Sequence, residues 1–399
     1  MKYDFETLPD RRGMDAIAVD AIGTPGGPAG PKEGFDAIPM WIADMNFAVC
    51  PAIQEAIIRR VQHPAFGYFD PSRAYFDAVI RWQSTHNRVT GLEKKHIGYE
   101  NGVLGGVIST LNVLCSRGDN VLLQSPTYVG FTHVLENNGY NMVLNPLKRD
   151  GEGVWRMDYE DMERKIVDNQ IHAAIFCSPH NPCGRVWTRE EIARAMAIFE
   201  KHQVWVISDE IWSDLLLNGH SHTPTQSVSD YARQHTAAFY APSKTFNLAG
   251  LVGSYHIIYN DWLRDRQAKE ASLPVYNAMN VLSMHALTGA YSPEGEEWVR
   301  QLLETLSGNI NYACDFIRDR FPGVSLQKPE GTYMLFVQCE DWCREHGKTM
   351  EELLKAGTDV GVAWQSGKLF KDPWGIRMNL VLPLHRVKEA FERLDKYVF

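Results

Sequence analysis

The chain has 399 residues, of which 44% are hydrophobic and 11% aromatic, so it is long enough to bury a large core and to form two lobes. Its formal net charge of −9, with acidic and basic residues interspersed, disfavours a nucleic-acid partner. The polar N-terminus lacks the apolar stretch of a signal peptide, and no run approaches the ~18 apolar residues of a membrane span. We therefore expect a cytoplasmic protein that contacts neither nucleic acid nor membrane.

Residues 20–38 are rich in glycine, proline and alanine and predict a loop or extended segment. From about residue 100 to 260, helical and strand patterns alternate, and Thr188 with Glu191 forms a capping box at the start of one helix. The predicted helices cover 102–115 and 189–202, and the predicted strands cover 120–126, 173–179, 204–210 and 237–243. This alternation predicts an α/β fold with a mostly parallel sheet flanked by helices.

After about residue 285 the pattern changes to longer helices around short strands. The predicted helices cover 296–321 and 385–398, and the predicted strands cover 331–338 and 375–382. This pattern favours a second, smaller α+β lobe. We expect a large domain over residues 46–284 and a small domain formed by residues 1–45 and 285–399.

Seven cysteines are scattered through the chain, mostly in apolar runs such as "AAIFC" and "LNVLC". An odd number in such surroundings is typical of reduced core residues. Cys177 with Cys183, and Cys339 with Cys343, are near in sequence, but neither pair has the C-x-x-C spacing of a zinc site. We predict no metal centre.

Polar side chains follow three of the predicted strands. Asn181 comes after "AAIFCSP", Asp209 ends "VWVISD", and Lys244 comes after "AAFYAPS". Alone, each has an ordinary explanation as a turn, a helix cap or a solvated lysine. Ligands of parallel α/β sheets, however, bind outside the carboxyl ends of the strands. The stretch "ENGVLGG" adds a helix start at Val103 and Leu104, whose unpaired N–H groups can hold a phosphate.

A lysine, a carboxylate, an amide and a phosphate cradle in one crevice are the groups that pyridoxal 5′-phosphate requires. A desolvated lysine is partly neutral and condenses with the cofactor's aldehyde. A buried carboxylate keeps the pyridine nitrogen protonated, an amide donates to the phenolic oxygen, and an aromatic side chain such as Tyr128 lies on the ring. The residues therefore predict an enzyme that uses this cofactor.

The motifs "SPHNPCGRVW", "SDEIWSDL" and "APSKTFNLAGL" together resemble the fold-type I pyridoxal-phosphate enzymes, the aspartate aminotransferase superfamily. The finer resemblance is to their MalY/PatB-like cystathionine β-lyase branch, and it runs over nearly the whole chain. It rests on "YDFETLPDRRG", "PMWIADMNF", "FGYFDPSRAYFDAVIRW", "NGVLGGV" and "RMNLVLP".

This resemblance implies the residues of the reaction and of substrate binding. Lys244 is the Schiff-base lysine and proton shuttle, Asp209 pairs with the pyridinium nitrogen, and Asn181 donates to the phenolic oxygen. Arg377 binds the substrate α-carboxylate as a two-pronged fork, assisted by the backbone near Ala43.

The resemblance also implies further contacts with the cofactor. Tyr128 stacks on the ring, and the amides of Val103 and Leu104 hold the phosphate together with the Ser243 hydroxyl. Tyr68 reaches the phosphate of the neighbouring subunit's site, which implies a homodimer with shared active sites.

Two positions depart from many relatives. Trp212 stands where many carry a tyrosine or histidine that touches the phenolic oxygen, and an indole can donate one hydrogen bond but cannot accept or titrate. It either makes a different bond to the cofactor or lines the pocket. Val252 stands where many transaminases carry a phosphate-binding arginine, which the lyase branch often lacks.

Three functions remain open at this point. The resemblance favours a carbon–sulfur β-lyase that acts on cystathionine, cysteine or an S-conjugate, and an aminotransferase using the same residues is the alternative. A regulatory protein on this fold is disfavoured, because Lys244 and Asp209 are both present and we expect no DNA-binding segment before "YDFETLPDRRG".

Overall fold

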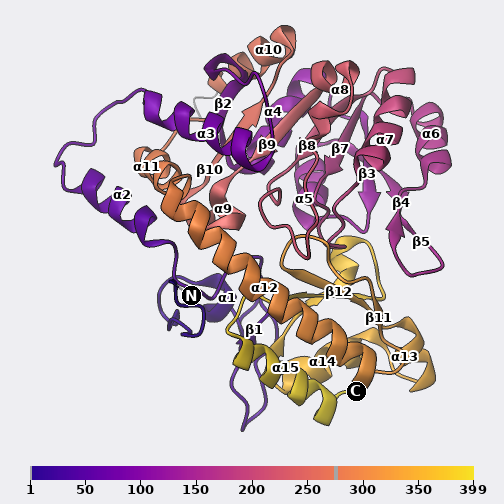
Figure 1. Ribbon diagram of the computed structural model, residues 1–399. Coiled ribbons are helices and arrows are strands. Elements are labelled where there is room, and N and C mark those ends of the chain that lie inside the picture. Colours follow the sequence, from indigo (N-terminus) through magenta and orange to yellow (C-terminus); the bar gives the residue numbers. More distant parts are fainter. Residues whose placement is uncertain (1, 274–276) are drawn as a thin grey trace.

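The computed structural model describes residues 2–273 and 277–399, arranged in two lobes (Figure 1). The upper lobe in Figure 1 contains a seven-stranded sheet of order β2-β10-β9-β8-β7-β3-β4. Its strands are β2 (Ile97–Asn101), β3 (Asn120–Ser125), β4 (Asn141–Pro146), β7 (Ala173–Cys177), β8 (Trp205–Asp209), β9 (Thr236–Tyr240) and β10 (Gly253–Ile257). Strand β10 is antiparallel to both neighbours and the other pairs are parallel, so the predicted mostly parallel sheet is confirmed.

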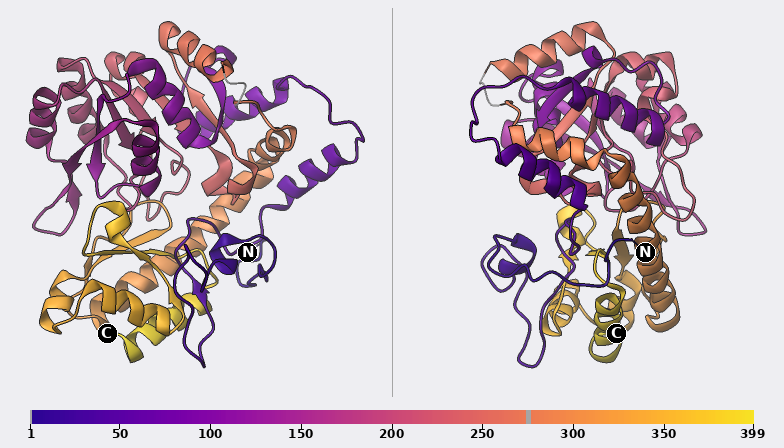
Figure 2. Two further views of the ribbon diagram at one scale, coloured as in Figure 1. Left: turned by 180° about the vertical axis from the view of Figure 1, so that it is seen from behind. Right: turned by 60° about the vertical axis from the view of Figure 1, so that its left-hand side comes forward.

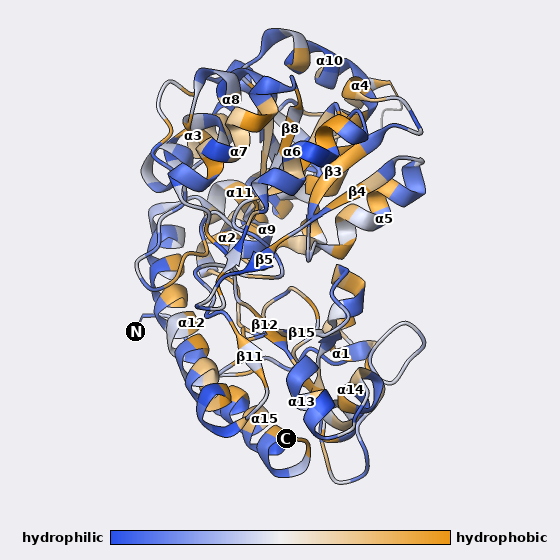
Figure 3. Cartoon of the chain, turned by 90° about the vertical axis from the view of Figure 1, so that its right-hand side faces the viewer, coloured by the Kyte–Doolittle hydropathy of each residue, from blue (hydrophilic) through white to orange (hydrophobic). Residues whose placement is uncertain are grey.

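Alternate residues of each central strand pack on opposite faces of this sheet. On β7, Phe176 joins one hydrophobic cluster, whereas Ile175 joins the other. In Figure 3, β3 is mainly hydrophobic, while α6 outside it carries strongly hydrophilic residues. One face is covered by α6 (Tyr159–Asp168), α7 (Arg189–Lys201) and α8 (Asp230–His235), and the other by α4 (Gly102–Leu114), α5 (Val129–Asn138) and α10 (Asp261–Ser272).

The second lobe contains a four-stranded antiparallel sheet of order β11-β12-β15-β14. Its elements are β11 (Ser325–Leu326), β12 (Met334–Gln338), β14 (Gln365–Ser366), β15 (Gly375–Asn379), α13 (Glu340–Glu345), α14 (Met350–Asp359) and α15 (Leu384–Tyr397). The N-terminal segment joins this lobe through β1 (Ile38–Pro39), which pairs with β13 (Val362–Ala363). The domain boundaries at residues 46 and 284 remain a prediction.

Helices also connect the two lobes. The long α12 (Pro293–Arg320) runs from the region of the large sheet to the far end of the small lobe (Figures 1 and 2). The remaining α-helices and strands are α1 (Ile17–Asp20), α2 (Pro51–Val61), α3 (Arg73–His86), α9 (Pro242–Thr245), α11 (Val281–Ala290), β5 (Lys148–Arg149) and β6 (Trp155–Arg156). None of the described helices is long and apolar enough to cross a membrane. The seven cysteines are free thiols, six of them buried.

The prediction of a strand through residue 243 was wrong at its end. Strand β9 stops at Tyr240, and Pro242 begins the short helix α9 on which Lys244 lies. Proline fits the first turn of a helix, because its fixed φ suits that position and its missing N–H would have no intrahelical partner there. Lys244 therefore lies on a helical turn, still at the carboxyl edge of the sheet.

Candidate cofactor and substrate site

A cavity of about 300 Å³ lies at the carboxyl ends of the central strands, at the lower end of the ~300–1,000 Å³ range of small-molecule sites. Most of the residues predicted from the sequence line it together. They are Ala43, Val103, Leu104, Tyr128, Asn181, Asp209, Trp212, Ser243 and Lys244. Residues remote in sequence thus surround one space, which matches a ligand the size of a single small ring with its substituents.

Lys244 presents its amine to this cavity. Its Nζ donates a hydrogen bond to the Ala43 carbonyl at 3.0 Å and lies 5.9 Å from the centre of the Trp212 ring. Burial, together with the smaller effect of the positive charge of Arg377, lowers the pKa of Lys244 from 10.5 to about 8. About a tenth of the amine is therefore neutral at pH 7, far more than for an ordinary lysine, and this neutral form is the one that a nucleophile or base requires.

Asp209 is a buried acid that forms no ion pair with any described residue, although the charge of nearby Lys244 acts on it weakly. It is the last residue of β8, and its Oδ1 accepts a hydrogen bond from the Ile211 amide at 3.0 Å. Burial raises the pKa of Asp209 from 3.8 to about 7. The adjacent Glu210 differs, because its carboxylate is occupied by His222 and Tyr240, each 2.6 Å away. Asp209 alone remains available to a ligand that carries a cationic nitrogen.

The opposite end of the cavity suits an anion. Helix α4 begins here at Gly102, whose φ of +73° lies in the left-handed region that favours glycine. The first amides of a helix have no intrahelical acceptor, and no acidic residue occupies the first turn of α4. Val103, Leu104 and the Ser243 side chain therefore form a cradle suited to a phosphate.

Arg377 is a buried cation at the boundary between the lobes. It donates hydrogen bonds to Asn181 Oδ1 at 3.2 Å, to Gln365 Oε1 at 2.6 Å and to the Trp41 carbonyl at 3.1 Å. Its Nε has no partner among the described residues, and no described carboxylate forms an ion pair with it. Burial lowers the pKa of Arg377 to about 10, so the group stays charged and is ready for an anionic substrate.

Sequence reasoning missed several of these neighbours. Gln365 reaches Arg377 because β14 and β15 pair in register, and no sequence pattern indicates that contact. Further lining residues lie beside the predicted ones on the same loops and strand ends. Their nearness in sequence to the predicted residues could have indicated that they also line the cavity. They are Asn101, Cys177, Ile211, Ala241, Ala249 and Gly253, whereas Gly102 and Val252 stand at positions that the sequence already linked to phosphate binding.

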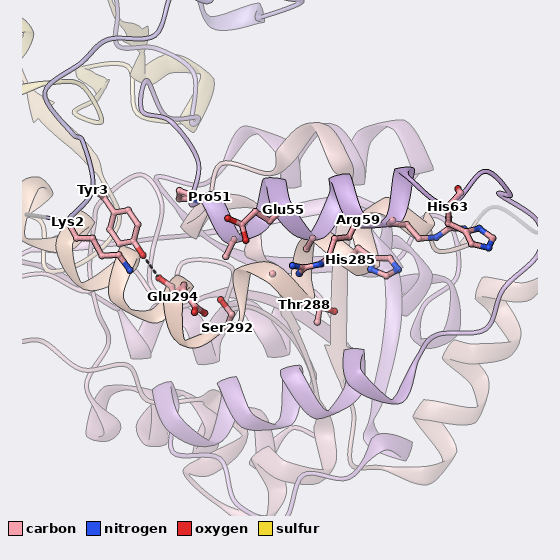
Figure 4. A pocket seen from close by; sticks show the side chains of 14 residues that line it. Lys2, Tyr3, Pro51, Glu55, Arg59, His63, His285, Thr288, Ser292 and Glu294 are labelled. Atoms are coloured by element: carbon pink, nitrogen blue, oxygen red, sulfur yellow. Dashed lines mark hydrogen bonds between the residues drawn. The ribbon is translucent and has the colours of Figure 1, made fainter.

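Two predicted site residues do not line this cavity: Arg377, which contacts it through its hydrogen bond to Asn181, and Tyr68. Tyr68 is fully exposed on the loop between α2 and α3, which projects from the large lobe (Figure 2). A separate groove of about 920 Å³ lies between α2 and α11, lined by polar side chains such as Glu55, Arg59 and His285 (Figure 4). This larger groove contains none of the predicted site residues.

The sequence matches the family described as aminotransferase class I and II over residues 38–394. It is 34% identical to the cystathionine β-lyase PatB of Bacillus subtilis (strain 168), with 89% of each chain covered. It is 30% identical to the protein MalY of Escherichia coli (strain K12), covering 84% of this chain and 83% of that one. The structure resembles the PLP-bound C-S lyase from Staphylococcus hominis with a TM-score of 0.88 at 27% identity, covering 100% and 98% of the chains.

Proposed function

Because the chain belongs to the aminotransferase class I and II family, we propose that it is a pyridoxal 5′-phosphate-dependent carbon–sulfur β-lyase. It converts a sulfur-containing amino acid and water into a thiol, pyruvate and ammonia. The observation that carries the proposal is the single cavity into which Lys244, Asp209 and Asn181 converge beside a helix N-terminus. The similarity to proteins named as lyases selects this reaction among those that such a site can perform.

The cavity fits the cofactor group by group. The cradle at Val103, Leu104 and Ser243 would hold the phosphate, Asp209 the ring nitrogen and Asn181 the phenolic oxygen. Bound there, pyridoxal 5′-phosphate supplies an aldehyde that condenses with amines and a conjugated ring that accepts the electron pair released at the substrate Cα. The buried, unpaired Asp209 supports this fit, because a protonated ring nitrogen is the partner that its carboxylate lacks.

The chain's own residues then perform binding and proton transfer. Arg377 holds the substrate α-carboxylate and so orients the Cα–H bond toward Lys244. The neutral Nζ of Lys244 removes that proton as general base. The sulfur leaves Cβ as a thiolate with the electrons of the C–S bond and takes up a proton to become the thiol. Tyr128 and Trp212 form walls of the cavity and would exclude water from a ring bound there.

An aminotransferase is the alternative, since the same residues would serve it and the family description names that activity. Incubation with L-cystathionine in the absence of any keto acid separates the two. The proposal predicts continued release of pyruvate and thiol over many turnovers, and none from the Lys244→Ala variant. One equivalent of pyridoxamine phosphate, formed without thiol or pyruvate, would contradict the lyase assignment.

A homodimer with shared active sites is also part of the proposal. Exposed apolar side chains gather on α2 and the following loop, where Ile58, Val61 and Phe66 accompany the fully exposed Tyr68. Val252, half exposed, lies at the mouth of the cavity. Exposed apolar surface of this kind marks contact with another chain. A second copy would cover these residues and place its own Tyr68 against the phosphate end of the cavity.

Mixing two variants tests this arrangement. In the proposed dimer, each site combines Lys244 of one chain with Tyr68 of the other, so the Lys244→Ala and Tyr68→Phe variants each damage both of their own sites. A mixed dimer keeps one intact site, which pairs the normal Lys244 of one chain with the normal Tyr68 of the other. The mixture should therefore be more active than the sum of its parts after subunit exchange, and light scattering should give a dimer's mass. A monomeric mass, or strictly additive activity, would refute shared sites. The predicted cytoplasmic location awaits fractionation of cells.

A further inference from the structure

Residues 41–46, the segment "WIADMN", lie without helix or strand between β1 and α2. Buried backbone groups of such a segment need hydrogen-bond partners, and side chains from distant parts of the chain supply them. The Asn379 amide donates to the carbonyls of Ile42 at 2.7 Å and Asp44 at 2.5 Å. Arg11 donates to Asp44 Oδ2 at 2.6 Å and to the Met45 carbonyl at 3.1 Å.

This segment contacts both Lys244 and Arg377, the proposed base and the proposed carboxylate-binding residue. The Trp41 carbonyl accepts a hydrogen bond from Arg377 at 3.1 Å. The Ala43 carbonyl accepts from Lys244 Nζ at 3.0 Å and from the Tyr333 hydroxyl at 3.1 Å. The position of the segment therefore influences both the amine that moves the proton and the guanidinium that binds the substrate.

Asn247 attaches this segment to the lysine loop. Its Oδ1 accepts from the Met45 amide and its Nδ2 donates to the Met45 carbonyl, both at 3.0 Å. Asn247 itself has a φ of +58°, a conformation that non-glycine residues adopt rarely and asparagine most readily. Glycine would adopt this backbone but lacks the amide. Asparagine is thus the residue that meets both requirements.

We propose that Asn247 is a positioning residue, which holds residues 41–46 so that the Ala43 carbonyl contacts Lys244 while the Trp41 carbonyl contacts Arg377. The inference rests on the proposed function, since it takes Lys244 as the base and Arg377 as the carboxylate site. Asn247 acts on Lys244 more strongly than on Arg377, because Arg377 keeps Asn181 and Gln365 when the segment moves.

The Asn247→Gly variant tests the inference, because glycine keeps the left-handed backbone and removes both hydrogen bonds. We expect kcat for L-cystathionine to fall about tenfold, as the loss of two hydrogen bonds implies, and KM to change less than about threefold. The matched control is Asn218→Gly, since Asn218 is exposed and has a φ of +52°, and it should behave as wild type.

A second measurement does not depend on turnover. Cofactor-free protein is mixed with pyridoxal 5′-phosphate, and the rate at which the visible absorption band appears is measured at several pH values. The pH at which this rate is half its maximum should be lower in Asn247→Gly, because the protonated Lys244 loses a well-placed hydrogen-bond acceptor. Should that variant not fold, Asn247→Asp tolerates the same backbone and keeps the acceptor but not the donor, so its kcat should still fall.

The outcomes separate the two proposals. A wild-type protein that neither forms the band nor releases thiol overturns the proposed function. The positioning role is overturned if the wild-type protein is active and the Asn247→Gly variant has the same kcat and the same pH midpoint. This holds even if urea unfolding shows that the variant is less stable. A lowered kcat with a shifted midpoint, absent in Asn218→Gly, supports it.

Discussion

Replacing Asp209 by asparagine should stabilise the cofactor-free protein while it damages the enzyme. The carboxylate is buried, accepts one hydrogen bond from the Ile211 amide and has no cationic partner among the described residues. Burial raises the pKa of Asp209 from 3.8 to about 7. The folded state binds the proton of Asp209 more tightly than the unfolded chain does. The stability that this protonated carboxyl contributes is therefore fully present below about pH 4 and is lost as the pH rises through about 7.

The size of this loss follows from the two pKa values. The difference between 3.8 and about 7 corresponds to roughly 4 kcal/mol at pH 8. Asparagine has nearly the same shape and no charge, so the cofactor-free Asp209→Asn variant should be more stable than wild type by up to about 4 kcal/mol at pH 8. The two proteins should be about equally stable near pH 4.

Urea unfolding of the cofactor-free proteins at several pH values between about 4.5 and 8 measures this difference as a shift in the midpoint. Asp265→Asn, at an exposed position, is the control and should leave the midpoint unchanged. In the loaded enzyme, the variant cannot hold the ring nitrogen protonated, and lyase activity should fall by about 10²-fold or more. A cofactor-free variant less stable than wild type at pH 8 would refute the reasoning.

The rate at which cofactor-free protein reacts with pyridoxal 5′-phosphate should rise with pH and reach half its maximum near pH 8, because the neutral Lys244 amine is the nucleophile. Stopped-flow absorbance measures it, and a midpoint near 10.5, the ordinary pKa of lysine, would argue against a desolvated amine. The Arg377→Lys variant should raise KM for L-cystathionine about 10- to 100-fold, since an ammonium cannot bind a carboxylate as a fork, and steady-state kinetics with an unchanged KM would exclude this role. Glu330→Gln should destabilise the protein by about 2–3 kcal/mol in urea unfolding, because the buried Arg185 loses one of its two carboxylate partners, the other being Glu191. A loss below about 0.5 kcal/mol would show that Glu191 alone suffices.

Local patterns in the sequence determined the central strands of the large sheet and the site residues at the carboxyl ends of those strands. The apolar runs that end at Cys177 and Asp209 form central strands, since residues of both faces must be buried in a parallel sheet covered by helices. Such strands end at a common edge, so the polar residues that follow them had to lie near one another. The carboxyl-edge position of Lys244 and Asn181 was therefore predictable before any contact was known.

The tertiary structure alone decided which distant side chains contact one another around the site. Gln365 and Trp41 meet Arg377, and Asn247 meets Met45, although they are remote in sequence or lie in irregular backbone. Periodicity reports which face of an element is buried, but not which element covers it. Those contacts depend on how separately patterned elements and irregular segments pack against one another. The family resemblance assigned Tyr68 to the neighbouring subunit's site, but no local pattern indicated that Tyr68 is fully exposed, because exposure is a property of the whole folded surface.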